Sequence, residues 1–66
     1  MDLGKSIKLA LVHKGITAHE VCEKINISES YFSRLSNNHR DPSIRLVSDI
    51  AAAIGYKTSD FLALGE

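Results

Sequence analysis

The sequence predicts an all-α fold of five short helices around one small core. Apolar residues recur at the three- and four-residue spacing of amphipathic helices, and residues that begin or end helices separate the apolar segments. The length of 66 residues suits one compact domain, 1–66, with a small core and no room for an enclosed catalytic cleft. We therefore expect a single domain that is not an enzyme.

Apolar stripes and caps predict the first two helices. The first covers residues 3 to about 14 and ends before Gly15, with a stripe made of Leu3, Ile7, Ala10 and Leu11. Thr17 and Glu20 have the spacing of a capping box, flanked by the apolar pair Ile16 and Val21. A second helix of two turns therefore covers about residues 18 to 25, and its stripe is Ala18, Val21, Cys22 and Ile25.

A third helix is predicted to follow at once. Asn26 tolerates the left-handed conformation that ends a helix, and Ser28 is a good N-cap for a helix that starts at Ser28 or Glu29. On a wheel of about 100° per residue, the apolar side chains share one face, namely Tyr31, Phe32 and Leu35. The opposite face carries short polar side chains and one arginine: Glu29, Ser30, Ser33 and Arg34. Short side chains let another molecule approach this face closely.

Two further helices complete the prediction. Asn37 and Asn38 close the third helix, residues 39–42 form a loop, and Ser43 caps a fourth helix. The fourth helix ends at Gly55, and its stripe is Val47, Ile50, Ala51 and Ile54. Thr58 or Ser59 is expected to cap a short fifth helix that contains Phe61 and Leu62.

The charge balance is neutral overall and uneven along the chain. Eight Lys and Arg residues against eight Asp and Glu residues give a formal net charge of zero, which by itself argues against a nucleic-acid partner. Residues 30–45 are nevertheless locally basic, because they hold three arginines and His39 against the single acid Asp41. One basic face on a neutral molecule is therefore expected.

Cysteine usage and targeting signals point to the cytosol. Cys22 is the single cysteine, and neither a secretory signal nor an apolar run of membrane-spanning length is present in the sequence. His19 and Cys22 lie three apart, but two ligands are too few for a metal site, and Cys22 falls on an apolar stripe. We expect structural roles for both residues and no cofactor.

The ordered motifs resemble those of the phage repressor and Cro group (XRE-type) of helix-turn-helix proteins. The matching segments are the capped second helix with its Asn turn and Ser cap, Tyr31-Phe32-Ser33-Arg34-Leu35, and Arg40-Asp41-Pro42-Ser43. The resemblance implies a compact lambda-repressor-like domain whose helix-turn-helix spans about residues 17–36, with the third helix as recognition helix. Asparagine replaces the group's usual glycine at 26 and 38, Ser36 replaces its glutamate, and Lys57 looks inserted.

Carried over by position, the resemblance makes Glu29, Ser30 and Arg34 readers of base edges, with Ser33 beside them. Glu29 has an alternative role, since a carboxylate there also complements the positive end of the third helix. Phosphate contacts are expected from the locally basic stretch and from two weaker sites, a set comprising Thr17, Asn37, His39, Arg40 and Arg45. The alternative for the basic residues is that they are ordinary solvated side chains of the surface, and it applies to Arg34, His39, Arg40 and Arg45.

The function implied is sequence-specific binding of double-stranded DNA by a Cro-like repressor, or by a restriction-modification controller or antitoxin of similar build. One recognition helix reads few base pairs, so we expect a homodimer on a palindromic operator, formed mainly on DNA. The expected dimer surface is Tyr56, Phe61 and Leu64, whereas Leu62 is assigned to the core. The alternative is a protein-interaction module that uses the same scaffold and binds no DNA.

Overall fold

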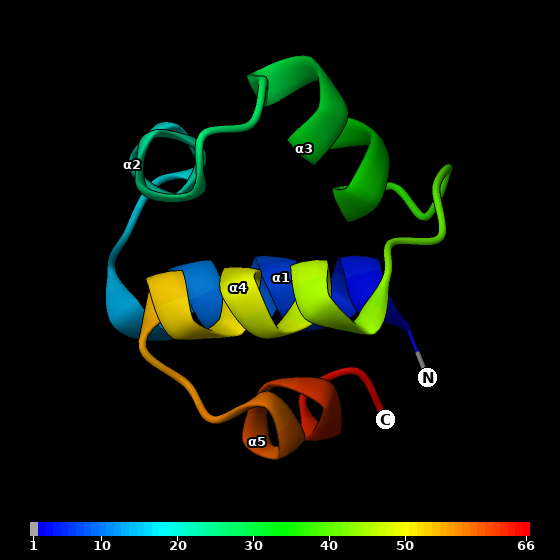
Figure 1. Ribbon diagram of the computed structural model, residues 1–66. Helices are drawn as coiled ribbons and strands as arrows, with labels where there is room; N and C mark the ends of the chain where they lie inside the picture. Colours follow the sequence, from blue (N-terminus) through cyan, green and yellow to red (C-terminus); the bar gives the residue numbers. More distant parts are fainter. Residues whose placement is uncertain (1) are drawn as a thin grey trace.

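The computed structural model describes residues 2–66, and these residues form five α-helices (Figure 1). The helices are α1 (Leu3–Lys14), α2 (Ala18–Ile25), α3 (Glu29–Ser36), α4 (Ile44–Ile54) and α5 (Thr58–Ala63). The all-α prediction and the bounds predicted for the first three helices are therefore confirmed. Within residues 2–66, no helix has the length and apolar character needed to cross a membrane.

The helices are arranged in three tiers. Helices α1 and α4 lie in the middle, α2 and α3 cover one side of this pair, and α5 covers the other side (Figure 1). Contacts of α1 with α3, α2 with α4, and both central helices with α5 join the tiers. Because only one side of α3 meets the rest of the molecule, its outer side is left open to a partner.

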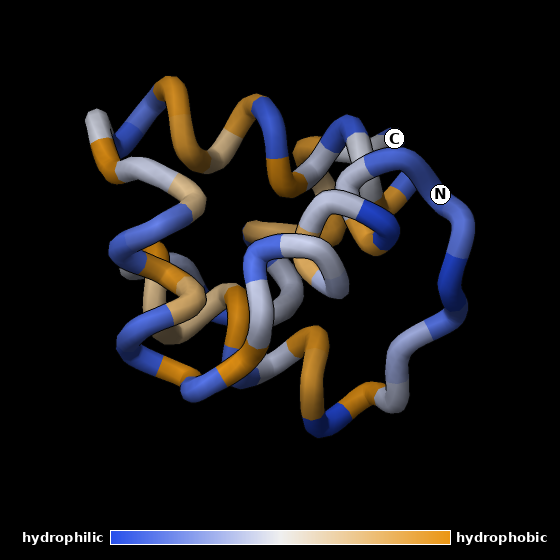
Figure 2. The backbone as a smooth tube through the Cα atoms, turned by 90° about the horizontal axis from the view of Figure 1, so that it is seen from above, coloured by the Kyte–Doolittle hydropathy of each residue, from blue (hydrophilic) through white to orange (hydrophobic). Residues whose placement is uncertain are grey.

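One core joins all five helices. Its fully buried large side chains include Ile7, Val21, Phe32, Leu35, Ile50 and Phe61. Polar and apolar stretches alternate along the helices in Figure 2, as expected when each helix turns one stripe inward. The predicted stripes are largely confirmed, although Leu11, Ala18 and Ile25 are only half-buried at the edge of the core.

Local caps fix where most helices begin and end. The Thr17 side chain and the Glu20 amide form one half of a capping box at α2, and the Glu20 carboxylate completes it at the Thr17 amide. Asn26 and Asn38 take the left-handed conformation, with φ of 57° and 59°. The predicted asparagine turns are therefore confirmed at both positions.

The predicted cap of α5 is wrong. Lys57 occupies the N-cap position and makes no side-chain hydrogen bond there. Thr58 lies inside the helix instead, where its hydroxyl donates to Ser48 Oγ of α4 at 3.1 Å. The Thr58 hydroxyl, which was expected to cap α5, therefore bonds to α4 instead.

The two ends of the described chain lie side by side (Figures 1 and 2). The Asp2 amide donates to the Gly65 carbonyl at 3.1 Å, and the Asp2 side chain accepts from the Lys5 amide at 3.0 Å as the N-cap of α1. Asp2 thus links the start of α1 to the C-terminal segment.

Candidate nucleic-acid interface

The outer face of α3 carries the side chains predicted to read bases. Glu29, Ser30, Ser33 and Arg34 are all exposed. The opposite face turns inward, as predicted: Phe32 and Leu35 are buried and Tyr31 is half-buried. The structure therefore brings the four predicted readers together on one open surface of a helix that is anchored from behind.

Hydrogen bonds at both ends hold α3 in place. Ser28 Oγ accepts from the Tyr31 amide at 3.1 Å and caps the start of the helix. At the other end Asn37 Nδ2 donates to the Ser33 carbonyl at 2.9 Å. Because Asn37 folds back over the last turn, its amide and the Ser33 side chain lie on the same stretch of surface.

The loop after α3 is tied to the start of α1. Asn38 Oδ1 accepts from the Gly4 amide at 2.9 Å, and Asn38 Nδ2 donates to Asp2 Oδ1 at 2.8 Å. The hydrogen bond from Asn38 is the main reason that the pKa of Asp2 is lowered, and the Lys5 amide adds to it. We call these three residues, Asp2, Gly4 and Asn38, the loop clasp. The sequence predicts the turn at Asn38 but not the clasp.

Close approach of α1 to the end of α3 requires glycine at position 4. A Cβ atom there would collide with the Ser36 carbonyl. Residues 4 and 36 therefore meet backbone to backbone, and this contact sets the distance between α1 and α3. The sequence signal for this contact was a glycine inside the first turn of a helix, where glycine otherwise lowers helix stability.

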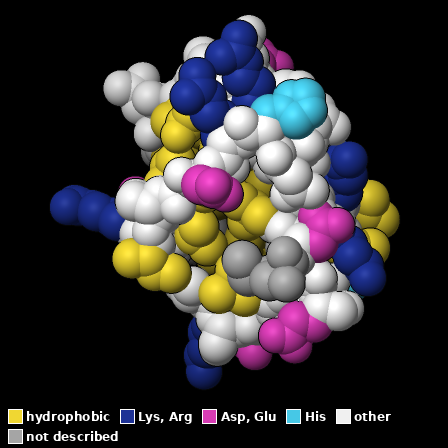
Figure 3. Space-filling model, turned by 90° about the vertical axis from the view of Figure 1, so that its right-hand side faces the viewer, with side chains coloured by type: hydrophobic (Ala, Val, Ile, Leu, Met, Phe, Trp, Pro, Cys, Tyr) yellow, Lys and Arg dark blue, Asp and Glu magenta, His cyan; other side chains and the backbone are white. Residues whose placement is uncertain are grey.

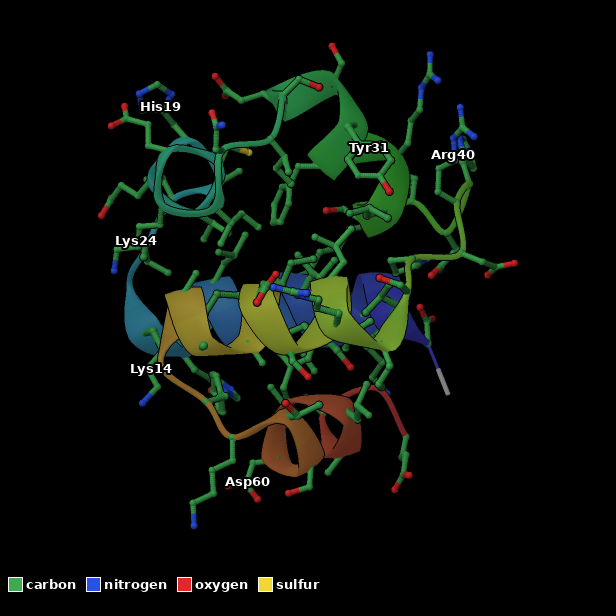
Figure 4. The ribbon with its side chains drawn as sticks, in the orientation of Figure 1. Lys14, His19, Lys24, Tyr31, Arg40 and Asp60 are labelled. Atoms are coloured by element: carbon green, nitrogen blue, oxygen red, sulfur yellow. The ribbon has the colours of Figure 1, made fainter. Side chains whose placement is uncertain are left out.

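The predicted phosphate-contacting residues lie around α3. His39 and Arg40 are exposed in the clasped loop, and Arg45 is exposed in the first turn of α4. Figure 3 shows Lys or Arg and His side chains gathered at the end of the molecule where α3 meets this loop. In Figure 4, Arg40 stands at one end of the upper side and His19 at the other, with α3 between them.

Thr17 lies at the start of α2 and is exposed, and its hydroxyl also contacts Glu20 Oε1 at 3.2 Å. Its structural role in the capping box is therefore shown, whereas a phosphate contact remains a prediction.

Two basic residues missed by the sequence reasoning border α3. Lys8 of α1 is exposed and lines a shallow groove with Ser33 and Asn37. Lys5 and Lys8 together line the adjoining groove beside Asn37 and the loop clasp. Their three-residue spacing on a helix was the available signal, because it places both ammonium groups on one face.

His19 lies between two carboxylates at the α2–α3 corner. Its Nδ1 is 3.1 Å from Glu29 Oε2, and its Nε2 contacts Glu23 Oε1. The hydrogen bond with Glu29 is the main cause that raises the pKa of His19, and the charge of Glu23 acts in the same direction. This pairing across the turn joins residues ten positions apart, and the sequence pattern does not predict it.

Cys22 has the structural place expected of it. The side chain is buried, its Sγ lies 3.9 Å from the Ser28 carbonyl, and burial raises the pKa of the thiol. Within residues 2–66, no cluster of three or more His, Cys, Asp or Glu side chains is arranged to hold a metal ion.

The predicted dimer surface needs a correction. Phe61 is 0% exposed and belongs to the core, so it cannot contact a partner. Tyr56 and Leu64 are half-buried, as is Leu62. Tyr56 also packs within its own chain, since its hydroxyl lies 3.2 Å from His13 Nδ1 and the Lys14 ammonium lies over its ring. Tyr56 and Leu64 therefore remain as partly exposed apolar side chains.

Comparisons with known proteins agree with this geometry. A family model described as helix-turn-helix matches residues 7–61. An immunity repressor protein of Bacillus phage phi105 is 29% identical over 59 residues, which are 89% of this chain and 41% of the repressor. The chain thus spans about two fifths of that relative's length. The crystal structure of the clp gene regulator ClgR from C. glutamicum superposes with a TM-score of 0.90 at 26% identity, covering 97% of this chain and 83% of that one.

Proposed function

The chain belongs to the helix-turn-helix family whose model matches residues 7–61, and on that premise we propose that it is a transcriptional regulator that binds double-stranded DNA sequence-specifically. The observation that carries the proposal is the outer face of α3. This face is exposed, bears short polar side chains and one arginine, and is capped and anchored on a buried inner face. A helix of this kind fits the major groove, whose base edges can be reached only at close approach.

Specificity comes from four side chains on that face. Arg34 donates to a guanine, the base whose two major-groove acceptors match its guanidinium. Glu29 accepts from a cytosine amino group, the base partner suited to a carboxylate. Ser30 and Ser33 contact neighbouring base edges, or their short side chains let α3 lie close to those edges.

Contacts to phosphates set the position of α3 on the duplex. Arg40 of the loop and Arg45 on α4 supply positive charge next to the recognition helix, and hydrogen-bonding groups come from His39 of the loop, Thr17 at the start of α2 and Asn37 at the end of α3. The location of Lys5 and Lys8 beside Asn37 adds two further cations on α1. The locally basic surface overcomes the zero net charge of the chain, because a neighbouring phosphate responds mainly to the charges nearest to it.

The regulator acts as a Cro-like repressor that occupies a palindromic operator as a homodimer. The name of the phage phi105 relative, an immunity repressor, supports repression over activation. Tyr56 and Leu64 form the dimer contact. Because they offer little apolar surface, dimers form mainly when two half-sites about 34–36 Å apart lie on one duplex.

Selection of bound sequences from a random duplex pool tests the function. We expect enrichment of a palindrome, with an affinity that falls steeply as salt is raised and phosphate counterions are released. A protein-interaction module on this scaffold would enrich no sequence and would show no such salt dependence, and that result would refute DNA recognition.

Comparison of one half-site with the selected palindrome tests the dimer. Sedimentation should show two chains per palindrome, and Tyr56→Ala should weaken binding to the palindrome more than binding to the half-site. Ala52→Ser, on an exposed α4 position, is the matched control. Equal affinity for half-site and palindrome, or one chain per palindrome, would refute the dimer.

A further inference from the structure

A carboxylate at the start of the recognition helix poses an electrostatic problem. Glu29 is the first residue of α3, and its side chain is 63% exposed. On the proposed DNA-binding face, this negative charge approaches the phosphates and is repelled by them. The positive end of α3 offsets part of this charge, and a cation beside Glu29 would lower the remaining electrostatic cost of entering the groove.

His19 occupies the position from which it can do so. One ring nitrogen lies 3.1 Å from Glu29 Oε2, and the other contacts Glu23 Oε1. A neutral imidazole has only one N–H donor, whereas the imidazolium has two. The two carboxylates are therefore both satisfied only when His19 is protonated.

The surroundings of the ring favour the same state. Three titratable groups border the hollow with His19: Glu23 on its own helix, Glu29 on α3, and the buried thiol of Cys22. Both carboxylates raise the pKa of His19. Within residues 2–66, no lysine or arginine lines this hollow to oppose them.

We propose that His19 is a positioning residue for DNA recognition, which as the imidazolium holds the Glu29 carboxylate against α2 and offsets part of the negative charge at this corner when α3 enters the major groove. The contact uses Oε2, and among the described residues Oε1 of Glu29 accepts no hydrogen bond, so Oε1 is available to a cytosine amino group. The inference rests on the proposed DNA-binding function and adds a residue from α2 to the reading surface of α3.

The inference predicts that binding takes up a proton. Phosphates close to the ring stabilise the imidazolium further, so the pKa of His19 is higher in the complex than in the free protein. Affinity therefore falls as pH rises through the interval between these two pKa values. Uptake of one proton limits the change to about tenfold in Kd per pH unit.

Two measurements separate this inference from the proposed function. The first follows the His19 ring by NMR during a pH titration of the free protein, which involves no DNA. Glu29→Gln should lower the pKa of His19 in this titration, because it removes the first cause of its rise. An unchanged pKa would overturn the pairing, and with it the inference, while leaving the proposed function intact.

The second measures Kd for the selected palindromic duplex from about pH 6 to about pH 8 at constant ionic strength. In the unmodified protein Kd should rise by about three- to tenfold over this range. His19→Gln should flatten this dependence, whereas His13→Gln, which changes an exposed histidine of α1, should retain it. His19 is 62% exposed, so both variants should fold, and circular dichroism verifies this.

The outcomes of the second measurement are distinct. DNA binding with the same pH dependence in His19→Gln as in the unmodified protein would overturn the inference and leave the function standing. Failure of the unmodified protein to bind any duplex would overturn both.

Discussion

Substitutions at Asn38 separate two roles that this residue combines. Its backbone takes the left-handed conformation at φ 59°, and its side chain ties the loop after α3 to the first turn of α1. Asn38→Gly allows the same backbone conformation and removes the side-chain hydrogen bonds. Asn38→Ala removes the same hydrogen bonds and also places alanine, which disfavours the left-handed conformation, at this position.

The structure gives the size of each effect. The bond between Asn38 Oδ1 and the Gly4 amide is partly buried, so its loss costs about 1 kcal/mol of unfolding free energy. The bond to Asp2 lies at the surface, where water competes with it, so its contribution is smaller than that of the bond to Gly4. The left-handed conformation adds roughly 1–2 kcal/mol for alanine. The unfolding free energy should therefore fall by about 1 kcal/mol in Asn38→Gly and by about 2–3 kcal/mol in Asn38→Ala.

Urea denaturation followed by circular dichroism measures both variants. A domain of this size has a stability of roughly 3–10 kcal/mol, so the ranking should be plain in the midpoints. Both variants should also weaken binding to every duplex, because the clasp holds the loop that carries His39 and Arg40. Equal midpoints for the glycine and alanine variants would refute the conformational argument. A glycine variant as stable as the unmodified protein would refute the stabilising role of the clasp.

Three further predictions concern stability. Thr17→Ala removes the hydroxyl of the capping box and should lower the unfolding free energy by about 1 kcal/mol, measured by thermal unfolding. Ser59→Ala removes no cap and should leave the thermal midpoint unchanged. Equal midpoints for the two variants would contradict the cap at Thr17. Gly4→Ala should cost about 1–3 kcal/mol because its Cβ forces the Ser36 carbonyl away, and a neutral result would contradict the close approach. The pKa of Asp2 is lowered in the folded state, so its stabilising effect is present above its ordinary value of 3.8 and is lost as pH falls through the lowered value. Asp2→Asn should thus be less sensitive to acid than the unmodified protein, and an identical acid-unfolding curve would contradict this.

Local signals explain why the helix bounds could be predicted. The capping box at Thr17 and Glu20, the Ser28 cap and the asparagine turns involve residues within a few positions of one another, and such interactions are formed by the chain itself. The exposed face of α3 could be predicted in the same way, because burial of Phe32 fixes the direction of the opposite face.

Contacts between distant residues explain what could not be predicted. The bond of Asn38 to Asp2 joins positions 36 apart in sequence, and the pairing of His19 with Glu29 depends on the angle between α2 and α3. Periodicity carries no information on either contact.

The wrong assignment of Phe61 has a related cause. In a six-residue helix, several apolar side chains compete for one side of the core, and packing against α1 and α4 decides which of them is buried.

The central claim is that α3 reads bases while the loop after it holds phosphates. Comparison of Arg34→Ala with Arg40→Ala, on the selected site and on duplexes with each base pair changed in turn, tests this most directly. Arg34→Ala should lose about 1–3 kcal/mol of binding free energy on the preferred site, and it should relax the preference at the one base pair whose guanine Arg34 contacts. Arg40→Ala should weaken all duplexes alike and reduce the salt slope by about one. An Arg34→Ala variant that retains the full sequence preference would contradict the claim.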